Sequence, residues 1–249
     1  MKRFLPRLGL AGGIDRDGSR AAELLASGFG SVEFGTVTPD AEPGCRSSVA
    51  LLTERLVALA TRLPDTQDNA LIGIGLGLGP GASLTALSGH WLAGLQAASP
   101  VADYLSFNLS AAAYRPLLAS EHAALLTQAL ATVANERQRL AAAGRRRVVL
   151  ALKLPLDGPP LSAAAQLAVA AGFDAVIVVL PQRPERFDWL QAWAQRIDGA
   201  AQLLAVGGIR SSVEVRAALD AGAGGIQVHS VFVEQGRACL PLLAGMMSD

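Results

Sequence analysis

Cysteine and histidine are scarce in this sequence. Cys45 and Cys239 are the only cysteines among 249 residues, and there are three histidines. Two cysteines are too few for a disulfide framework and are typical of ordinary thiols in a reducing compartment. No spacing of cysteine and histidine matches a metal site. We therefore expect a cytoplasmic protein without a structural or catalytic metal.

An excess of charge and a long apolar run are also missing. Charged residues make up 17% of the chain, and 21 basic residues balance 21 acidic ones. A net charge of zero does not favour nucleic acid or anionic lipid as a partner, so we expect a small molecule. The apolar run near the start is interrupted by Asp15, Arg16 and Asp17 before it reaches the roughly 20 residues of a membrane span. Neither a signal peptide nor a membrane helix is predicted.

Hydrophobic residues are abundant, at 51%, and they occur in a repeating order. Short runs rich in Val, Ile, Leu and Gly alternate with longer Ala/Leu-rich stretches at helical spacing, which is typical of repeated βα units with a parallel sheet. The predicted strands are 8–13, 31–36, 71–77, 103–108, 148–154, 175–180, 203–209 and 225–230. The clearest predicted helices are 47–63, 117–143, 160–171 and 212–221.

Eight such units favour a single (β/α)₈ TIM barrel that spans residues 1–249. No change in composition and no linker divides the chain. An open, doubly wound sheet also alternates strands and helices and is the main alternative. In a barrel the functional residues lie at the carboxyl ends of the strands, so these ends are where we look for a site.

The strongest local pattern lies in the last two units. Gly207 and Gly208 follow the seventh strand, and His229 and Ser230 lead from the eighth strand into a helix. Glycines and a helix start present backbone amides that attract an anion, and in barrels these two loops often bind phosphate. The alternative is that the glycines only shape a tight turn.

Lysine is rare, which makes Lys153 conspicuous. Only Lys2 and Lys153 are present, and Lys153 lies near the carboxyl end of an apolar strand, VVLALKL. Such a lysine either faces the site or extends along the surface with its ammonium in water.

Several motifs, in this order, resemble the dihydroorotate dehydrogenase family of FMN-binding barrels. They are GLAGGIDRDG at 9–18, GFGSVEFGTVTP at 28–39, IGIGLG at 72–77, ADYLSFNLS at 102–110, Lys153, and AVGGI with AGAGGIQVHS within 205–230. The resemblance implies that FMN binds here as cofactor and that Ala11, Gly12, Thr36, Asn108 and Lys153 surround its ring. It also implies that Gly207, Gly208, His229 and Ser230 hold its phosphate. A homodimer, which is common in the family, is the oligomeric state that the resemblance suggests.

Departures from the family's pattern fall on the substrate side. The family's NxSSPNT-like loop reads NLSAAAY here. Ala111 stands where class 2 members of the family have the catalytic base, and Ala113 stands where they have a substrate-binding asparagine. Alanine cannot accept a proton. Arg16 replaces a lysine of the family, which keeps the positive charge with a different shape, and Gly75 replaces an asparagine. We therefore do not expect orotate to be the product.

Other ionisable residues have structural alternatives. Glu33 is expected to face the barrel interior, where a carboxylate requires a partner. Asp15 and Asp17 lie in a loop at the functional end, but a solvated turn is the favoured interpretation of this pair. Tyr114 and Arg115 follow the missing base and are candidates for a proton donor or an anion clamp.

Three hypotheses remain open at this level. The first is an FMN-dependent oxidoreductase that acts on a small anionic compound, with Lys153, Arg16 and Asn108 as its catalytic residues. The second is a Schiff-base lyase or synthase that acts on a phosphorylated carbonyl compound through Lys153. The third is a non-catalytic relative that binds a phosphorylated ligand.

Overall fold

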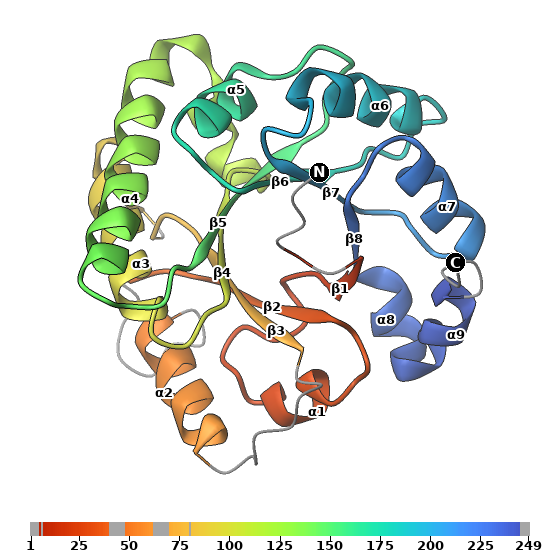
Figure 1. The fold of residues 1–249 in the computed structure, drawn as a ribbon, viewed down its shortest axis with the longest axis horizontal. Coiled ribbons are helices and arrows are strands. Elements are labelled where there is room, and N and C mark those ends of the chain that lie inside the picture. The colour runs from red at the N-terminus through yellow and green to blue at the C-terminus, as the bar shows by residue number, and fades with distance from the viewer. Residues whose placement is uncertain (1–4, 6, 40–47, 62–69, 80, 245–249) are drawn as a thin grey trace.

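In a computed structural model of the chain, eight parallel strands close into a barrel (Figure 1). The structure describes residues 5, 7–39, 48–61, 70–79 and 81–244. The strands are β1 (Leu8–Leu10), β2 (Ser31–Val37), β3 (Leu71–Leu76), β4 (Tyr104–Asn108), β5 (Val149–Pro155), β6 (Ala175–Val179), β7 (Gln202–Val206) and β8 (Gly225–Val228). Each strand pairs with its neighbour in sequence, and β8 pairs with β1. The predicted (β/α)₈ barrel is therefore confirmed, and the open sheet is excluded.

Helices surround the barrel on its outside (Figure 1). They are α1 (Ala21–Leu25), α2 (Val49–Ala60), α3 (Leu87–Ala98), α4 (Ala123–Ala142), α5 (Ala163–Ala170), α6 (Arg186–Ile197), α7 (Ser212–Asp220), α8 (Ser230–Gln235) and α9 (Cys239–Ala244). Short 3₁₀ segments are η1 (Leu84–Ala86), η2 (Ala112–Leu118), η3 (Ser120–His122) and η4 (Gly236–Ala238). Serine side chains cap the amino ends of α2, α5 and α7 by accepting a backbone hydrogen bond.

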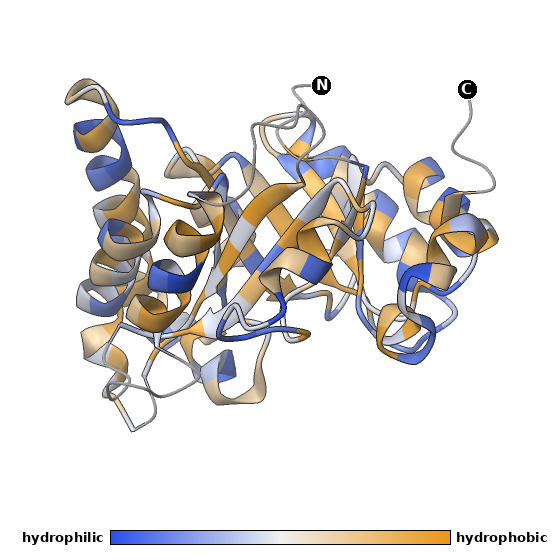
Figure 2. Cartoon of the chain, turned by 90° about the horizontal axis from the view of Figure 1, so that it is seen from below, coloured by the Kyte–Doolittle hydropathy of each residue, from blue (hydrophilic) through white to orange (hydrophobic). Residues whose placement is uncertain are grey.

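Two layers of apolar side chains fill the structure. The larger layer lies between the strands and the helices and includes Trp91, Phe107 and Trp193, all of which are buried. The smaller layer lies inside the barrel and includes Tyr104, Ala151, Ile177 and Leu204. Figure 2 shows the hydrophobic residues concentrated along the strands, with hydrophilic ones on the outer helices and loops. Because successive side chains of a strand point to opposite faces, every second residue points into the barrel and the others point toward the helices.

The amino-terminal end of the barrel is sealed around Gln202. The side-chain oxygen of Gln202 accepts a hydrogen bond from the backbone N–H of Leu5 (2.8 Å), and its amide nitrogen donates to the carbonyl of Leu5 (3.0 Å). Gln202 is fully buried at the start of β7. These contacts occupy the end of the barrel that lies opposite the carboxyl ends of the strands.

Some predicted boundaries were wrong. The helix predicted over 117–143 begins at Ala123, because the segment before it forms two 3₁₀ turns separated at Ala119, whose backbone is extended. The first strand ends at Leu10 instead of residue 13, and the seventh at Val206 instead of residue 209, where Gly207 and Gly208 adopt positive φ angles of 102° and 65°. Of the helix predicted over 47–63, residues 47, 62 and 63 lie outside the described residues, as do Lys2 and Cys45.

In the described part of the chain, no single helix has the length and apolarity needed to cross a membrane. The bent pair Ala112–Leu118 and Ser120–Ala142 meets those criteria jointly, with an angle of 77° between its two parts.

Candidate functional site

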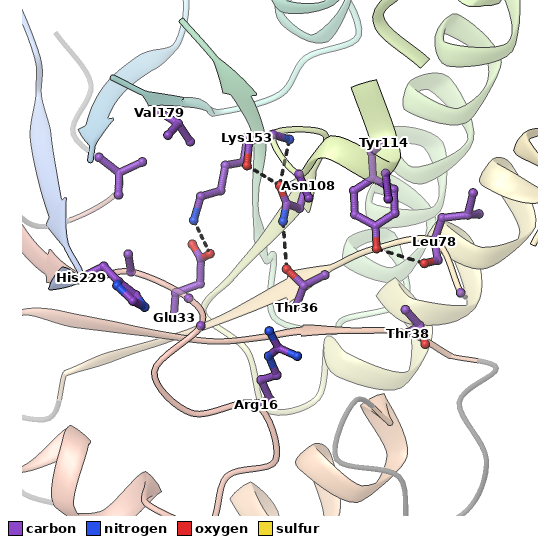
Figure 3. A pocket seen from close by; sticks show the side chains of 18 of the residues that line it. Arg16, Glu33, Thr36, Thr38, Leu78, Asn108, Tyr114, Lys153, Val179 and His229 are labelled. Atoms are coloured by element: carbon purple, nitrogen blue, oxygen red, sulfur yellow. Dashed lines mark hydrogen bonds and ion pairs between the residues drawn. The ribbon is translucent and has the colours of Figure 1, made fainter. Parts of the chain in front are cut away.

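A cavity of about 740 Å³ opens at the carboxyl ends of the strands (Figure 3). This volume lies within the range of roughly 300–1,000 Å³ that is typical of sites for small molecules and cofactors. Eight of the ten predicted site residues line it: Ala11, Gly12, Arg16, Thr36, Asn108, Lys153, Gly207 and His229. Gly208 and Ser230 are not among its lining residues. The residues that follow separate strands are thus brought together as the barrel rule predicts.

Lys153 and Glu33 form an ion pair at the cavity. Lys153 on β5 shares the inward face with Ala151, and its Nζ lies 2.9 Å from Oε1 of Glu33 on β2 (Figure 3). Both side chains are buried, with exposed fractions of 9% and 3%. A surface position for Lys153 is thereby excluded, and Glu33 is paired as its interior position requires. The cavity therefore contains a positive and a negative charge that compensate each other.

A buried polar chain continues from Glu33 into the barrel. Oε2 of Glu33 accepts a hydrogen bond from the side-chain nitrogen of Gln227 (3.1 Å), and the same nitrogen lies 3.0 Å from the hydroxyl of Tyr104. Burial, and then the nearby charge of Glu33, raise the pKa of Tyr104 well above its ordinary value. Tyr104 therefore stays a neutral phenol, and the carboxylate of Glu33 is held from two sides.

Asn108 is fixed at the end of β4 by its neighbours. Its side-chain nitrogen donates to Oγ1 of Thr36 (2.9 Å), and its oxygen accepts from the backbone N–H and the hydroxyl of Ser110 (2.9 and 2.7 Å). The peptide bond between Gly35 and Thr36 is cis. Asn108 and Thr36, far apart in the sequence, are thus joined by a hydrogen bond beside the cavity (Figure 3).

The loop after β1 carries Arg16 to the cavity. Asp15 holds this loop, because its carboxylate accepts hydrogen bonds from the backbone of Asp17, Gly18 and Arg20. Its carbonyl also accepts from Gly35 on β2 (3.0 Å). Arg16 therefore lies beside the end of β2, with an exposed side chain that lines the cavity (Figure 3).

Asp15 and Asp17 have structural roles. Asp15 is buried, and its carboxylate accepts hydrogen bonds from the backbone of the loop around it. Asp17 is also buried, and its Oδ2 lies 2.7 Å from Nη1 of Arg55 in α2. The description of this loop as a solvated turn was wrong, because both carboxylates are enclosed by hydrogen bonds.

The loops after β7 and β8 lie side by side, as the predicted anion site requires. Val206 pairs with Gln227, so Gly207 and His229 follow adjacent strand ends. Arg210, in the β7–α7 loop, forms an ion pair with Glu234 of α8. The backbone amides of Gly208, Ile209, Ser230 and Val231 donate to no acceptor among the described residues. Amides without acceptors at adjacent strand ends are suited to an anionic group.

His229 is half-buried at this edge of the cavity. Burial, and then the charge of Lys153, lower the pKa of His229 below its ordinary value of 6.5. A Cβ atom on Gly13 would lie 3.2 Å from Nε2 of this imidazole, so the backbone of the β1 loop passes close to the ring. His229 is therefore neutral at pH 7.

The segment after β4 forms an apolar wall. Ala111 and Ala113 line the cavity with exposed methyl groups, and Tyr114 crosses to the loop after β3, where its hydroxyl donates to the carbonyl of Leu78 (3.0 Å). Arg115 is exposed and is not among the lining residues. The hydroxyl of Ser110 donates to Asn108 and so does not replace the missing base.

Sequence reasoning missed Gln227, Tyr104 and Thr38. Gln227 and Tyr104 stand inside apolar strands, where a polar side chain is informative because its burial requires a partner. Thr38 lines the cavity and is 4% exposed, and its hydroxyl has no hydrogen-bond partner among the described residues. Nothing in the local sequence distinguishes Thr38 from a threonine in an ordinary strand end.

Comparison with known proteins identifies the relatives of this chain. It is 29% identical over 272 residues to dihydroorotate dehydrogenase (quinone) of Methylococcus capsulatus, an alignment that covers 94% of this chain and 80% of the relative. It is 28% identical over 289 residues to the enzyme of the same name from Cupriavidus necator, with 98% and 84% covered. The chain is thus similar, over nearly its whole length, to enzymes named dihydroorotate dehydrogenase (quinone). No family model matches it.

Solved structures of similar fold support the same architecture. Ligand-free DHODH of Eimeria tenella superposes with a TM-score of 0.76 at 18% identity, over 96% of this chain and 82% of that one. The same protein in complex with ferulenol gives a TM-score of 0.75 at 18% identity, over 96% and 80%. At this identity the structural likeness concerns the barrel fold alone, and the resemblance seen in the motifs is confirmed by the sequence relatives.

Proposed function

We propose that the chain is an FMN-dependent oxidoreductase of the dihydroorotate dehydrogenase type that acts on a small anionic compound other than orotate. The observation that carries this proposal is the gathering of Ala11, Gly12, Thr36, Asn108 and Lys153 in one cavity, next to the β7 and β8 loops, whose backbone amides lack acceptors among the described residues.

The residues present fit FMN. Ala11 and Gly12 are small and permit a flat ring to approach, and the amides after β7 and β8 are suited to a phosphate. Gly207, Gly208, His229 and Ser230 would hold that phosphate, and Ala11, Gly12, Thr36, Asn108 and Lys153 would surround the ring. When bound, FMN supplies two-electron transfer between a substrate and an acceptor.

The side chains of the cavity would orient the bound cofactor and stabilise its charge. Glu33 holds Nζ of Lys153 in place at the cavity by a hydrogen bond, and a positive charge there favours an electron-rich ring. Thr36 and Ser110 hold the amide of Asn108 in one orientation. His229, neutral at pH 7, offers a hydrogen bond without adding charge beside Lys153.

The substrate side argues against orotate. Ala111 and Ala113 are at the cavity, where the family has a base and a substrate-binding asparagine, and neither can transfer a proton or bind a polar ring edge. Arg16 remains available for an anionic group.

The Schiff-base hypothesis is less well supported. A lysine attacks a carbonyl with a nitrogen that is free to approach it, whereas Nζ of Lys153 is held at 2.9 Å by Oε1 of Glu33. The absence of a base on the β4 segment is compatible with a non-catalytic relative, and the cofactor experiment below separates that hypothesis from an oxidoreductase.

Purified protein tests the proposal directly. We expect flavin absorption bands in the isolated protein, release of FMN on denaturation, and binding of added FMN by the apoprotein. Lys153→Gln should weaken FMN binding or shift the flavin reduction potential, whereas Arg145→Gln, an exposed change between α4 and β5 at the other end of the barrel, should do neither. A colourless protein that takes up no FMN would contradict the proposal. FMN uptake without reduction by any small anion would favour the non-catalytic relative.

A further inference from the structure

One side of the cavity is walled by apolar side chains. They come from the segments that follow β3 and β4, which are adjacent strands, so the two segments face the cavity together. Six residues form this wall: Leu78, Ala82, Leu84, Ala111, Ala113 and Tyr114. Their side chains offer contact area and, apart from the tyrosine hydroxyl, no hydrogen-bonding group.

Two hydroxyl groups at the wall already donate to partners within the chain. The hydroxyl of Tyr114 donates to the carbonyl of Leu78, and the hydroxyl of Ser110 donates to Asn108. A ligand whose body carries several amide or carbonyl groups would lose its hydrogen bonds to water here without gaining replacements, which is unfavourable by about 1–3 kcal/mol for each buried group. The wall therefore selects a ligand with an apolar body.

The charge of this side is positive. Lys153 and Glu33 compensate each other, His229 is neutral at pH 7, and Arg16 forms no hydrogen bond or ion pair with any described residue. A guanidinium is suited to a carboxylate, which accepts its hydrogen bonds.

We infer that this side of the cavity binds a small carboxylate with an apolar, ring-sized body, its carboxylate on Arg16 and its body against the wall. This inference rests on the proposed function, because it assigns the substrate class of that same site. An aromatic or alicyclic acid combines one negative charge with the apolar surface that the wall requires, and neither orotate nor acetate does.

Four probe ligands separate the two requirements. Benzoate carries both features, acetate carries the charge alone, benzamide carries the ring without the charge, and orotate carries a polar ring. By calorimetric titration of FMN-loaded protein, we expect benzoate to bind at least about ten times more tightly than each of the other three. Equal affinity for benzoate and orotate, or for benzoate and acetate, would overturn the inference.

Variants locate the two ends of the ligand. Arg16→Gln should weaken benzoate binding about tenfold or more and leave benzamide binding unchanged. Ala113→Asn, which places an amide on the wall, should weaken benzoate binding and strengthen orotate binding. Arg145→Gln is the matched control and should change no affinity, since Arg145 lies at the opposite end of the barrel. Benzoate binding that is unaffected by Arg16→Gln would contradict the assignment.

The same experiment distinguishes the two proposals. FMN uptake is measured first, without any carboxylate, and its failure contradicts the proposed oxidoreductase alone. Calorimetry of the apoprotein with benzoate and orotate then still tests the ligand class. If FMN is retained and the four probes bind equally weakly, the oxidoreductase proposal stands and the ligand class is wrong.

Discussion

Nζ of Lys153 on β5 and Oε1 of Glu33 on β2 meet at 2.9 Å across the mouth of the barrel, 120 residues apart in the chain. Lysine is otherwise almost absent from this sequence, and this one is paired where an uncompensated charge would be unfavourable. The pair connects the stability of the barrel with the chemistry of its cavity.

Glu33→Gln should lower the free energy of unfolding by about 3 kcal/mol, because it leaves the buried ammonium without its counter-charge. Urea unfolding monitored by circular dichroism measures this change. The double variant Glu33→Gln with Lys153→Gln should lose less than the sum of the single changes. Strict additivity would show that the two side chains do not stabilise each other.

Lys153→Gln should raise the pKa of His229. Burial lowers this pKa first and the charge of Lys153 lowers it further, so removing the charge leaves only the effect of burial. A pH titration of the imidazole by NMR measures the shift, with His122 as the control. Because the folded protein resists protonation of His229, its contribution to stability should decline as the pH falls below 6.5. An unchanged titration in the variant would place the ammonium too far away to act on the ring.

Gly12→Ala should disturb the site through its added methyl group. Gly12 is not among the glycines with a positive φ angle, so the backbone itself can accept alanine. A Cβ atom at this position would lie 2.7 Å from Oε1 of Glu33, so the ion pair with Lys153 must move. We expect a loss of stability of about 1–3 kcal/mol and weaker FMN binding. Gly89→Ala is the control: no atom lies within 4 Å of its Cβ position in α3, and alanine should stabilise that helix by up to about 1 kcal/mol. Equal effects of the two changes would argue against the close approach at Gly12.

Glu136→Gln should destabilise the protein at neutral pH and much less in acid. Hydrogen bonds from Arg139 on the same helix and from Gln96 of α3 lower the pKa of Glu136 from 4.5 to about 2. A carboxyl group with a lowered pKa stabilises the fold above its unfolded value of 4.5, and this contribution is lost as the pH falls toward 2. Chemical unfolding at pH 7 and pH 3 should show the difference between wild type and variant shrinking at the lower pH.

The barrel and most of the site could be predicted because both follow from short sequence patterns and their succession along the chain. Alternation of apolar runs and helical stretches predicts the eight strands, and the barrel rule then places Thr36, Asn108, Lys153 and Gly207 at one end. The start of α4 could not be predicted in this way, because Ala and Leu before residue 123 continue the helical pattern while Ala119 adopts an extended backbone.

Contacts between distant segments could not be predicted. Tyr114 donates to Leu78 only because β3 and β4 are neighbours and their following segments meet. The enclosure of Asp17 depends likewise on Arg55 of a separate helix. Such contacts are set by strand register and helix packing, which no short stretch of sequence contains.

Closure of the barrel by pairing β8 with β1 has a consequence for how the cavity assembles. Arg16 follows the first strand and His229 the last, so neither contributes to a cavity until the two ends of the chain have met. A ligand that contacts both loops would bind only the closed barrel and would oppose separation of β1 from β8. Hydrogen exchange in β1 and β8 should therefore slow on ligand binding more than exchange in β5 and β6.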